Sequence, residues 1–445
     1  MAESGARSED QALSREDSLR ARDRERVRRS RAEGRALRLL WLLAGPGVLV
    51  MLGENDGPSM VSYATTGVVY GIGFFIPFIL LTFVMAYVVQ EMTVRLAVAT
   101  HRGHAELIFQ RFGPFWGYFA MADLVFGNLL TLVTEFIAIQ AGGLYFGLSP
   151  AVSVLCGVLV VFASLALRRY ATWERALLLL ALGNLLFIPA AFLAHPHPGA
   201  VLRALAFWSP LPGGFDTKFL LLMLADIGAT VTPWMIFFQQ SAVVDKGLTR
   251  VDVPQGRLDT AIGALLAAAA AIATLLAAAP LHAAHAVAQT LATGADFATA
   301  LKPYIGHGGA TLFALGMTEA GMVAAMTIST SSSYALAETL SVGRSLNLDF
   351  RAGRWFYGAA IGSTLLAAGI VLIPGAPLLA MTLAVNVIAT LLMAPALLFL
   401  LLLVNDREIM GGLANGKLAN LAGGAIVIGI ALAGAVYGFM TVFHP

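Results

Sequence analysis

The amino-acid sequence predicts an all-α integral membrane protein with eleven transmembrane helices, arranged as two inverted five-helix repeats and one extra helix. Hydrophobic residues make up 58% of the 445 residues and charged residues only 12%, about half of the ~25% usual in soluble domains. Eleven apolar runs approach or exceed the ~20 residues that cross a bilayer. The first and the sixth of these runs are each interrupted at a proline.

The chain begins with a charged segment that differs from everything after it. Residues 1–38 carry eleven Arg against eight Asp or Glu and almost nothing apolar. This composition is typical of disorder, and an Arg cluster before a first span favours the inner face of a membrane. We therefore predict a disordered cytoplasmic tail over residues 1–37, with no cleavable signal peptide.

The apolar runs after the tail are the predicted spans. They cover approximately 38–66 (broken), 72–98, 115–143, 149–167, 173–194, 217–243 (broken), 258–280, 309–338, 355–373, 376–403 and 420–442. Each broken run is followed by four unbroken ones, which gives five spans in each half. Because five is an odd number, the second half starts on the other side of the membrane and has the opposite orientation. This pattern indicates an inverted repeat with a binding site at mid-membrane between the two broken helices. The predicted units are 38–195, 196–403, and 404–445, the last being a cytoplasmic loop and the eleventh helix.

The basic residues predict how the chain is oriented. If the N-terminus is cytoplasmic, 25 of the 28 Lys and Arg lie on the inner side, and only Arg203, Lys218 and Lys302 lie outside. Because inner loops of membrane proteins are enriched in Lys and Arg, we expect a multi-pass cell-membrane protein with the N-terminus inside and the C-terminus outside.

The break in the first span carries the strongest functional signal. Its sequence is Gly53-Glu54-Asn55-Asp56-Gly57-Pro58-Ser59, with apolar residues on both sides. Acids at mid-membrane are costly and are functional candidates by default, and a broken helix also frees backbone carbonyls. We interpret Asp56 as a cation ligand, assisted by carbonyls around Gly57. The alternative, an acid that locks helices together by pairing with Arg or Lys, lacks a basic partner in any mid-membrane stretch.

Several motifs together resemble one transporter family. Gly45-Pro46-Gly47 opens the first span, Ile227 to Pro233 forms the break in the sixth span, and Asn405 to Gly411 ends the tenth. These motifs are similar to those of the natural resistance-associated macrophage proteins (NRAMP), proton-coupled importers of transition-metal ions. The resemblance covers nearly the whole chain and implies a LeuT-like inverted repeat and a divalent metal ion as the cargo.

The departures from the family pattern concern the metal ligands. Where the family has Asp-Pro-Gly-Asn, this chain has Asp56-Gly57-Pro58-Ser59, so Ser59 stands in place of an amide. Thr232 replaces the metal-binding methionine, and the carbonyl ligand would fall at Ala229. The expected donors are therefore all oxygen, which favours hard cations such as Mg²⁺ over soft ones. The pattern resembles the NRAMP-related magnesium transporters, described as carrying Mg²⁺ and Mn²⁺; a hydroxyl that only bonds its own helix is the alternative for Thr232.

The expected proton path is also altered. Trp234 stands where relatives have a histidine, and the two acids that relatives have on the third span fall at Thr131 and Thr134. A proton relay needs titratable groups, so we predict transport without obligate proton coupling. Glu135 lies one residue from an expected acid and leaves the proton-coupled alternative open.

The remaining polar residues of the spans are secondary candidates. Glu54 is two residues from Asp56 and would share its cation only if the helix unwinds. Asp226, Glu319 and Asn386 are candidates for the ion path or for groups behind the ligands, as are Glu135 and Trp234. For each of them, a hydrogen bond or packing between helices is the alternative.

These features favour three transporter functions, in the following order. The favoured function is a Mg²⁺ or Mn²⁺ carrier that works by alternating access. A proton-coupled Mn²⁺ or Fe²⁺ symporter is the second alternative, and an amino-acid carrier of the same fold the third. No HExxH motif or Ser-His pair supports an enzyme. We expect no cofactor, no nucleic acid partner, and a monomer in the lipid bilayer.

Overall fold

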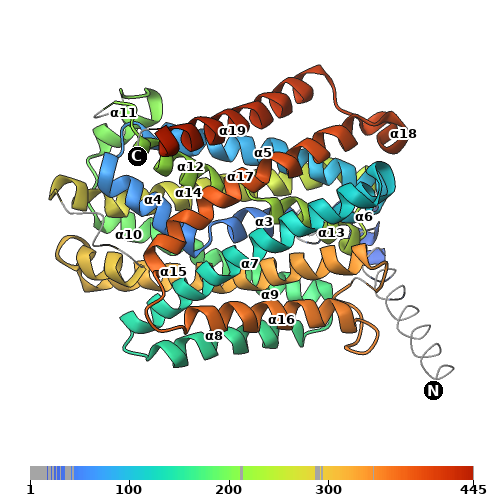
Figure 1. Ribbon diagram of the computed structural model, residues 1–445, viewed down its shortest axis with the longest axis horizontal. Helices are drawn as coiled ribbons and strands as arrows, with labels where there is room; N and C mark the ends of the chain where they lie inside the picture. The colour runs from blue at the N-terminus through green and yellow to red at the C-terminus, as the bar shows by residue number, and fades with distance from the viewer. Residues whose placement is uncertain are drawn as a thin grey trace.

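The computed structural model describes residues 45–210, 214–285, 291, 294–343 and 345–443, together with scattered residues of the first 44. Its secondary structure within these ranges is entirely helical (Figure 1). Most of the predicted disordered tail, 1–37, lies outside the described residues; those described between 18 and 32 are helical.

The helices follow the predicted spans closely. The first half contains α3 (Pro46–Glu54), α4 (Gly57–Tyr70), α5 (Phe75–Thr100), α6 (His104–Phe112), α7 (Pro114–Tyr145), α8 (Pro150–Leu165), α9 (Tyr170–Ala181), η1 (Leu182–Leu186), α10 (Phe187–Leu193) and α11 (Pro198–Ala206). The second half contains α12 (Thr217–Gly228), α13 (Pro233–Lys246), η2 (Arg250–Asp252), α14 (Val253–Ala283), α15 (Gly294–Thr339), α16 (Arg354–Val371), α17 (Leu378–Asn405), α18 (Arg407–Met410), η4 (Gly411–Leu413) and α19 (Lys417–Phe443). The short helices α6, α11 and α18 were not predicted.

The number of spans is not fixed by the helices alone. Within the described residues, eight helical segments are long and apolar enough to cross a membrane. They correspond to α5, α7, α9–α10, α12–α13, η2–α14, α15, α17 and α19. The other three predicted spans correspond to the α3–α4 pair, α8 and α16, which do not meet the same criterion. The count of eleven therefore stays a prediction.

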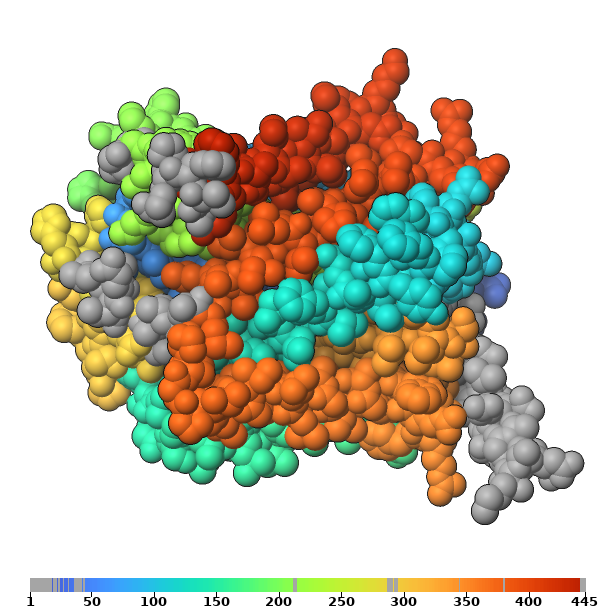
Figure 2. Space-filling view, in the orientation of Figure 1, coloured from blue at the N-terminus to red at the C-terminus, as the bar shows by residue number. Residues whose placement is uncertain are grey.

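The two broken spans form the centre of the molecule. Nearly every side chain of α3, α4 and α13 is buried. In the α12–α13 segment, 89% of the most apolar stretch is buried, against 22% for α19. Helix α14 packs against both α3 and α4, and α15 packs along α7. Helix α19 lies at one edge beside α17, and α8 and α16 lie at the opposite edge (Figures 1 and 2).

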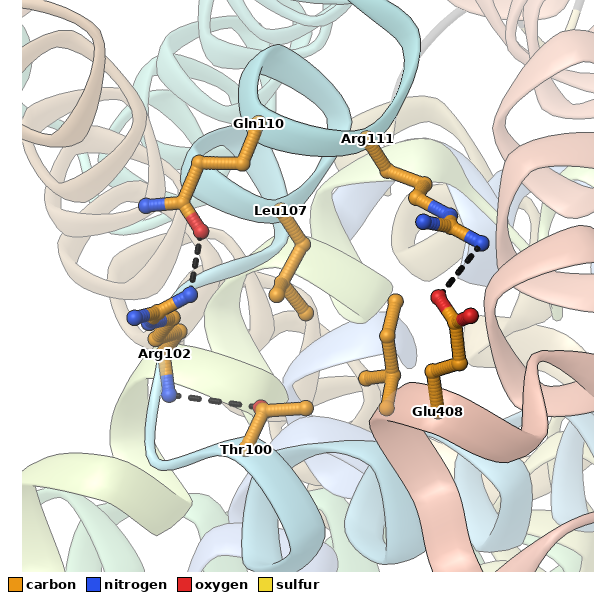
Figure 3. Close-up of a pocket in the computed structure, with 7 residues that line it drawn as sticks. Thr100, Arg102, Leu107, Gln110, Arg111 and Glu408 are labelled. Atoms are coloured by element: carbon orange, nitrogen blue, oxygen red, sulfur yellow. Dashed lines mark hydrogen bonds and ion pairs between the residues drawn. The ribbon is translucent and has the colours of Figure 1, made fainter.

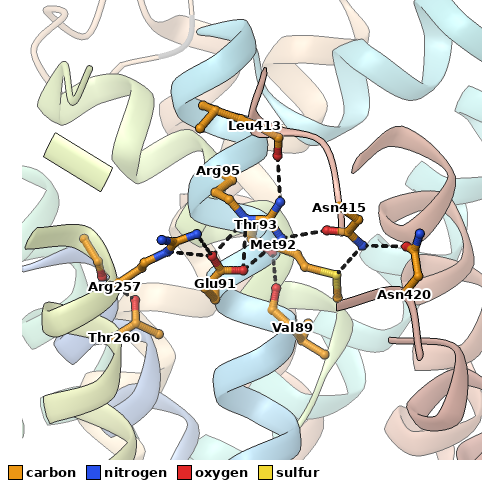
Figure 4. Close-up of polar contacts among 11 residues, drawn as sticks. Val89, Glu91, Met92, Thr93, Arg95, Arg257, Thr260, Leu413, Asn415 and Asn420 are labelled. Atoms are coloured by element: carbon orange, nitrogen blue, oxygen red, sulfur yellow. Dashed lines mark hydrogen bonds and ion pairs between the residues drawn. The ribbon is translucent and has the colours of Figure 1, made fainter. Parts of the chain in front are cut away.

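An ion-pair network joins three elements at the predicted cytoplasmic end. Glu91 of α5 accepts from Arg95 Nε at 2.8 Å and also from Arg257 of α14 (Figure 4). Arg95 further donates to the carbonyl of Leu413 and to Asn415 Oδ1, both at 2.7 Å. The network therefore connects α5 and α14 to η4 and to the residues that follow it.

Candidate cation site

The first break is built around Asp56. Helix α3 ends at Glu54 and α4 starts at Gly57, so only Asn55 and Asp56 are non-helical. The Asp56 carboxylate caps α4, because its Oδ1 accepts the Ser59 backbone N–H at 2.8 Å. Pro58 fits here because the first turn of a helix does not need its missing N–H. Asn55 secures the break to α14 by donating to the Ala267 carbonyl at 2.8 Å.

The second break faces the first. Helix α12 ends at Gly228 and α13 starts at Pro233, which leaves Ala229 to Thr232 outside regular helix. Thr232 Oγ1 donates to Glu54 Oε2 at 2.7 Å, a direct contact between the two breaks. The two interruptions predicted from sequence are thus adjacent in space.

Tyr63 makes a second connection between the breaks. Its hydroxyl donates to the Ala229 carbonyl at 2.8 Å and lies 2.9 Å from Thr230 Oγ1. Thr230 in turn contacts Thr82 Oγ1 of α5 at 3.0 Å. The carbonyl predicted as a metal ligand is therefore occupied by a phenol in this conformation.

Glu135 of α7 reaches the first break. Its Oε2 accepts the Gly57 N–H at 3.1 Å. Gly57 allows this approach, because a Cβ there would lie 2.1 Å from the Ala138 Cβ. By contrast, the Thr131 and Thr134 hydroxyls donate to carbonyls of their own helix.

Several buried oxygens around the first break have no hydrogen-bond partner among the described residues. They are Glu54 Oε1, Asn55 Oδ1, Ser59 Oγ and Glu135 Oε1. All four residues are fully buried. Buried polar atoms without partners are rare in folded proteins because each costs ~1–3 kcal/mol. Oxygens of this kind are the donors that a hard cation takes.

Two further predicted residues, Asp226 and Asn386, form hydrogen bonds to α4 next to the breaks. Asp226, one helical turn before Thr230, accepts from Thr66 Oγ1 of α4 at 3.0 Å. Asn386 of α17 donates to Ser62 Oγ at 2.9 Å. Both link a broken helix to a neighbour. Asp226 Oδ1 has no partner among the described residues.

Trp234 and Glu319 have different surroundings. Trp234 is buried beside the first break, and a Cβ at Gly53 would lie 3.4 Å from its ring. Glu319 packs against Gly183 of η1. The described residues contain no group of three or more His, Cys, Asp or Glu that could hold a metal. A cation here would therefore need hydroxyl, carbonyl or water oxygens beside the carboxylates.

The family model described as natural resistance-associated macrophage protein-like matches residues 47–440. The chain belongs to the Nramp family. The predicted resemblance is thus confirmed, and the match includes both breaks, so the chain is a multi-pass membrane protein.

Individual relatives agree with this membership. The chain is 26% identical over 394 residues to a divalent metal cation transporter MntH of Pectobacterium carotovorum, covering 87% of this chain and 91% of that protein. It is 25% identical to an MntH of Aeromonas hydrophila, covering 86% and 92%. These relatives are named as transporters, which are not enzymes.

Solved structures show the fold. A crystal structure of a manganese transporter of Eremococcus coleocola superposes with a TM-score of 0.71 at 20% identity, covering 90% of this chain and 86% of that one. MhsT in complex with L-phenylalanine superposes with a TM-score of 0.61 at 14% identity, covering 88% and 97%. The predicted all-helical, LeuT-type fold is confirmed.

Sequence reasoning missed Tyr63, Thr66 and Thr82 in this Nramp site. Tyr63 carried a usable signal, because a tyrosine at mid-membrane needs a partner for its hydroxyl. The two threonines carried no such signal, since a threonine in a helix commonly bonds its own backbone.

A separate cavity of about 310 Å³ lies between α6 and α18 (Figure 3). Its arginines are already neutralised: Arg111 pairs with Asp406 and Glu408, and Arg102 pairs with Glu106. This cavity therefore offers no excess charge to a ligand.

Proposed function

We propose that this Nramp protein is a secondary transporter that carries divalent metal cations, Mg²⁺ or Mn²⁺, by alternating access and without obligate proton coupling. The observation that carries the proposal is the contact between the two helix breaks, where Glu54 meets Thr232 beside Asp56. The names of its relatives, divalent metal cation transporters, support the cargo class.

The chemistry of the donors supports a hard cation. The side-chain donors are the carboxylate and hydroxyl oxygens of Asp56, Glu54, Ser59 and Thr232. Backbone carbonyl oxygens of Gly57 and Ala229 are the other donors. For the Ala229 carbonyl to bind the cation, its hydrogen bond from the Tyr63 hydroxyl would have to break. Mg²⁺ is bound through one or two carboxylates and keeps several waters, which suits such a site. A thioether or an imidazole would favour softer ions, and positions 232 and 234 hold Thr and Trp.

The side chains of the third predicted span support transport without obligate proton coupling. A relay through the third span would need titratable groups at 131 and 134, and both residues are threonines whose hydroxyls bond their own helix.

One observation favours the second candidate, a proton-coupled Mn²⁺ or Fe²⁺ symporter. Glu135 lies at the first break, bonded to Gly57, with its other oxygen free of partners among the described residues. A carboxylate next to the cargo is able to exchange a proton for a metal ion, and Glu135→Gln tests this role.

The decisive experiment is uptake into proteoliposomes that contain a pH dye. Mg²⁺, Mn²⁺, Ca²⁺ and Cd²⁺ are offered to the wild type, to Asp56→Asn and to Glu135→Gln. We expect Mg²⁺ and Mn²⁺ uptake without internal acidification, and loss of uptake in Asp56→Asn. An Asn side chain at position 56 still accepts the hydrogen bond that caps α4, so we expect the Asp56→Asn variant to fold. A loss of uptake in this variant then reports on cation binding and not on misfolding. Unchanged uptake in Asp56→Asn would refute the site, and metal-driven acidification that Glu135→Gln abolishes would establish the symporter instead.

We also propose that the N-terminus is cytoplasmic, the C-terminus is outside, and the protein acts as a monomer. The distribution of Lys and Arg supports the orientation.

A further inference from the structure

The carboxylate of Glu319 on α15 is buried and lies outside the proposed divalent site. Only 8% of the residue is exposed, and neither carboxylate oxygen has a hydrogen-bond partner among the described residues. An isolated carboxylate in a low-dielectric interior costs several kcal/mol unless a compensating charge is present. The fold therefore keeps a costly group at a position where the described residues give it no support.

Glu319 lies directly against η1, the 3₁₀ helix that interrupts the fifth predicted span. A Cβ at Gly183 would lie 2.7 Å from Glu319 Cγ and 2.9 Å from its Oε2. The Glu319 carboxylate therefore fits at this position only because residue 183 has no side chain. Hydrogen bonds have poorer geometry in 3₁₀ helices, and each carbonyl keeps a second lone pair, so this turn also offers backbone oxygens.

The next residue of η1 adds another oxygen. Asn184 is fully buried, and its Nδ2 donates to the Leu52 carbonyl of α3 at 3.3 Å. Its Oδ1 has no partner among the described residues. Helix α15 and η1, which pack together, thus contribute three buried side-chain oxygens without partners.

We propose that Glu319, Asn184 and η1 form a second cation site that takes a monovalent metal cation, with Na⁺ as the probe. A single carboxylate and a monovalent cation make an electrically neutral pair. A divalent cation would leave an uncompensated positive charge in an apolar environment.

A proton alone satisfies this geometry less well. A protonated Glu319 would carry one O–H donor, for which Asn184 Oδ1 or a carbonyl of η1 is the available kind of acceptor, and its other carboxyl oxygen would still have no partner among the described residues. An unmade buried hydrogen bond costs ~1–3 kcal/mol. A metal cation takes both carboxylate oxygens as ligands, and in the proposed site the Asn184 amide oxygen or a carbonyl of η1 supplies a further one.

The position of the site links it to transport. Asn184 bonds to Leu52, which is two residues before Glu54 at the end of α3. A cation held at η1 would therefore favour one position of α3, and a Na⁺ gradient would bias the movement of that helix. This goes beyond the proposed function, because binding at Glu319 does not require a divalent cargo.

The test measures binding without any divalent metal. Thermal unfolding of the purified full chain is followed in NaCl and in choline chloride at equal ionic strength and constant pH. We expect Na⁺ to raise Tm in the wild type, because a ligand of the folded state stabilises it. Glu319→Gln should raise the half-saturating Na⁺ concentration at least about tenfold, equivalent to ~1.4 kcal/mol of binding.

Two variants make the result specific. Glu338 lies on the same helix and is also buried, but its Oε1 accepts from Ser241 Oγ at 2.6 Å. The Na⁺ response of the Glu338→Gln variant should therefore match that of the wild type. Gly183→Ala crowds the Glu319 carboxylate and should weaken the response even if Glu319→Gln fails to fold. An equal Na⁺ response in wild type, Glu319→Gln and Gly183→Ala overturns the proposal, as does a stabilisation that follows pH and not Na⁺. Uptake of divalent ions is assayed separately, so failure of one proposal leaves the other intact.

Discussion

At the first break, two acidic residues each use one carboxylate oxygen for a hydrogen bond within the protein and leave the other for the proposed cargo. Glu54 uses Oε2 to accept from Thr232, and Glu135 uses Oε2 to accept from Gly57. The Oε1 atom of each has no partner among the described residues. Because the first oxygen fixes the side chain, the second is already positioned, which lowers the entropic cost of binding a cation.

Thr232→Met is predicted to change ion selectivity. The substitution removes the hydroxyl that bonds Glu54 and introduces a thioether, a softer ligand. We expect the ratio of Cd²⁺ to Mg²⁺ uptake in proteoliposomes to rise roughly tenfold, which corresponds to ~1.4 kcal/mol. Thr232→Val is the matched control, since it removes the same hydroxyl without adding sulfur. If both variants give the same ratio, residue 232 does not contact the cargo.

At the scale of elements, the approach of α4 to α7 determines the shape of the first break. A Cβ at Gly57 would lie 2.1 Å from the Ala138 Cβ, whereas a Cβ at Gly53 would meet its nearest atoms at 3.4 Å. Gly57→Ala must therefore displace α4 from α7 and break the bond to Glu135. We predict at least about a tenfold loss of uptake in Gly57→Ala. Gly53→Ala in the same stretch is the control and should retain uptake; equal activity of the two would contradict this account.

The docking of α6 is predicted to make stability depend on pH. His104 is fully buried between α6 and α13, with Nδ1 2.8 Å from Gln240 Oε1. Burial lowers the pKa of His104 to about 4, with the Gln240 contact acting weakly in the opposite direction. The unfolded chain takes up a proton near pH ~6.5 and the folded chain only near 4, so stability should fall as pH drops through this window.

The measurement is Tm between pH ~7 and ~4 for the wild type and two variants. His104→Gln should lose part of the acid-induced decrease in Tm. His307→Gln changes an exposed histidine and should behave like the wild type. An identical pH profile for His104→Gln and the wild type would show that His104 is not the titrating group.

At the scale of the whole molecule, the inverted arrangement places the break of one half against that of the other. Contacts such as Tyr63 to Ala229 join residues 166 positions apart in the chain. The same arrangement, with the Lys and Arg pattern, predicts the N-terminus inside and the C-terminus outside.

The orientation can be tested with single added cysteines near each end, in a Cys156→Ser background, because Cys156 is exposed. A membrane-impermeant thiol reagent applied to intact cells should label the C-terminal cysteine only. Labelling of the N-terminal cysteine would reverse the predicted topology.

By itself, the sequence indicated an apolar, multi-span helical protein, both helix breaks, the family resemblance and Asp56 as the central candidate. These features depend on hydropathy, proline and charge, which are properties of short stretches of chain. Only the tertiary structure decided that Thr232 bonds Glu54, that Tyr63 occupies the Ala229 carbonyl, and that Glu135 reaches Gly57. The Glu54–Thr232 bond, for example, joins residues 178 positions apart. Such pairings depend on how the helices pack and rotate against one another, which no local stretch of sequence specifies.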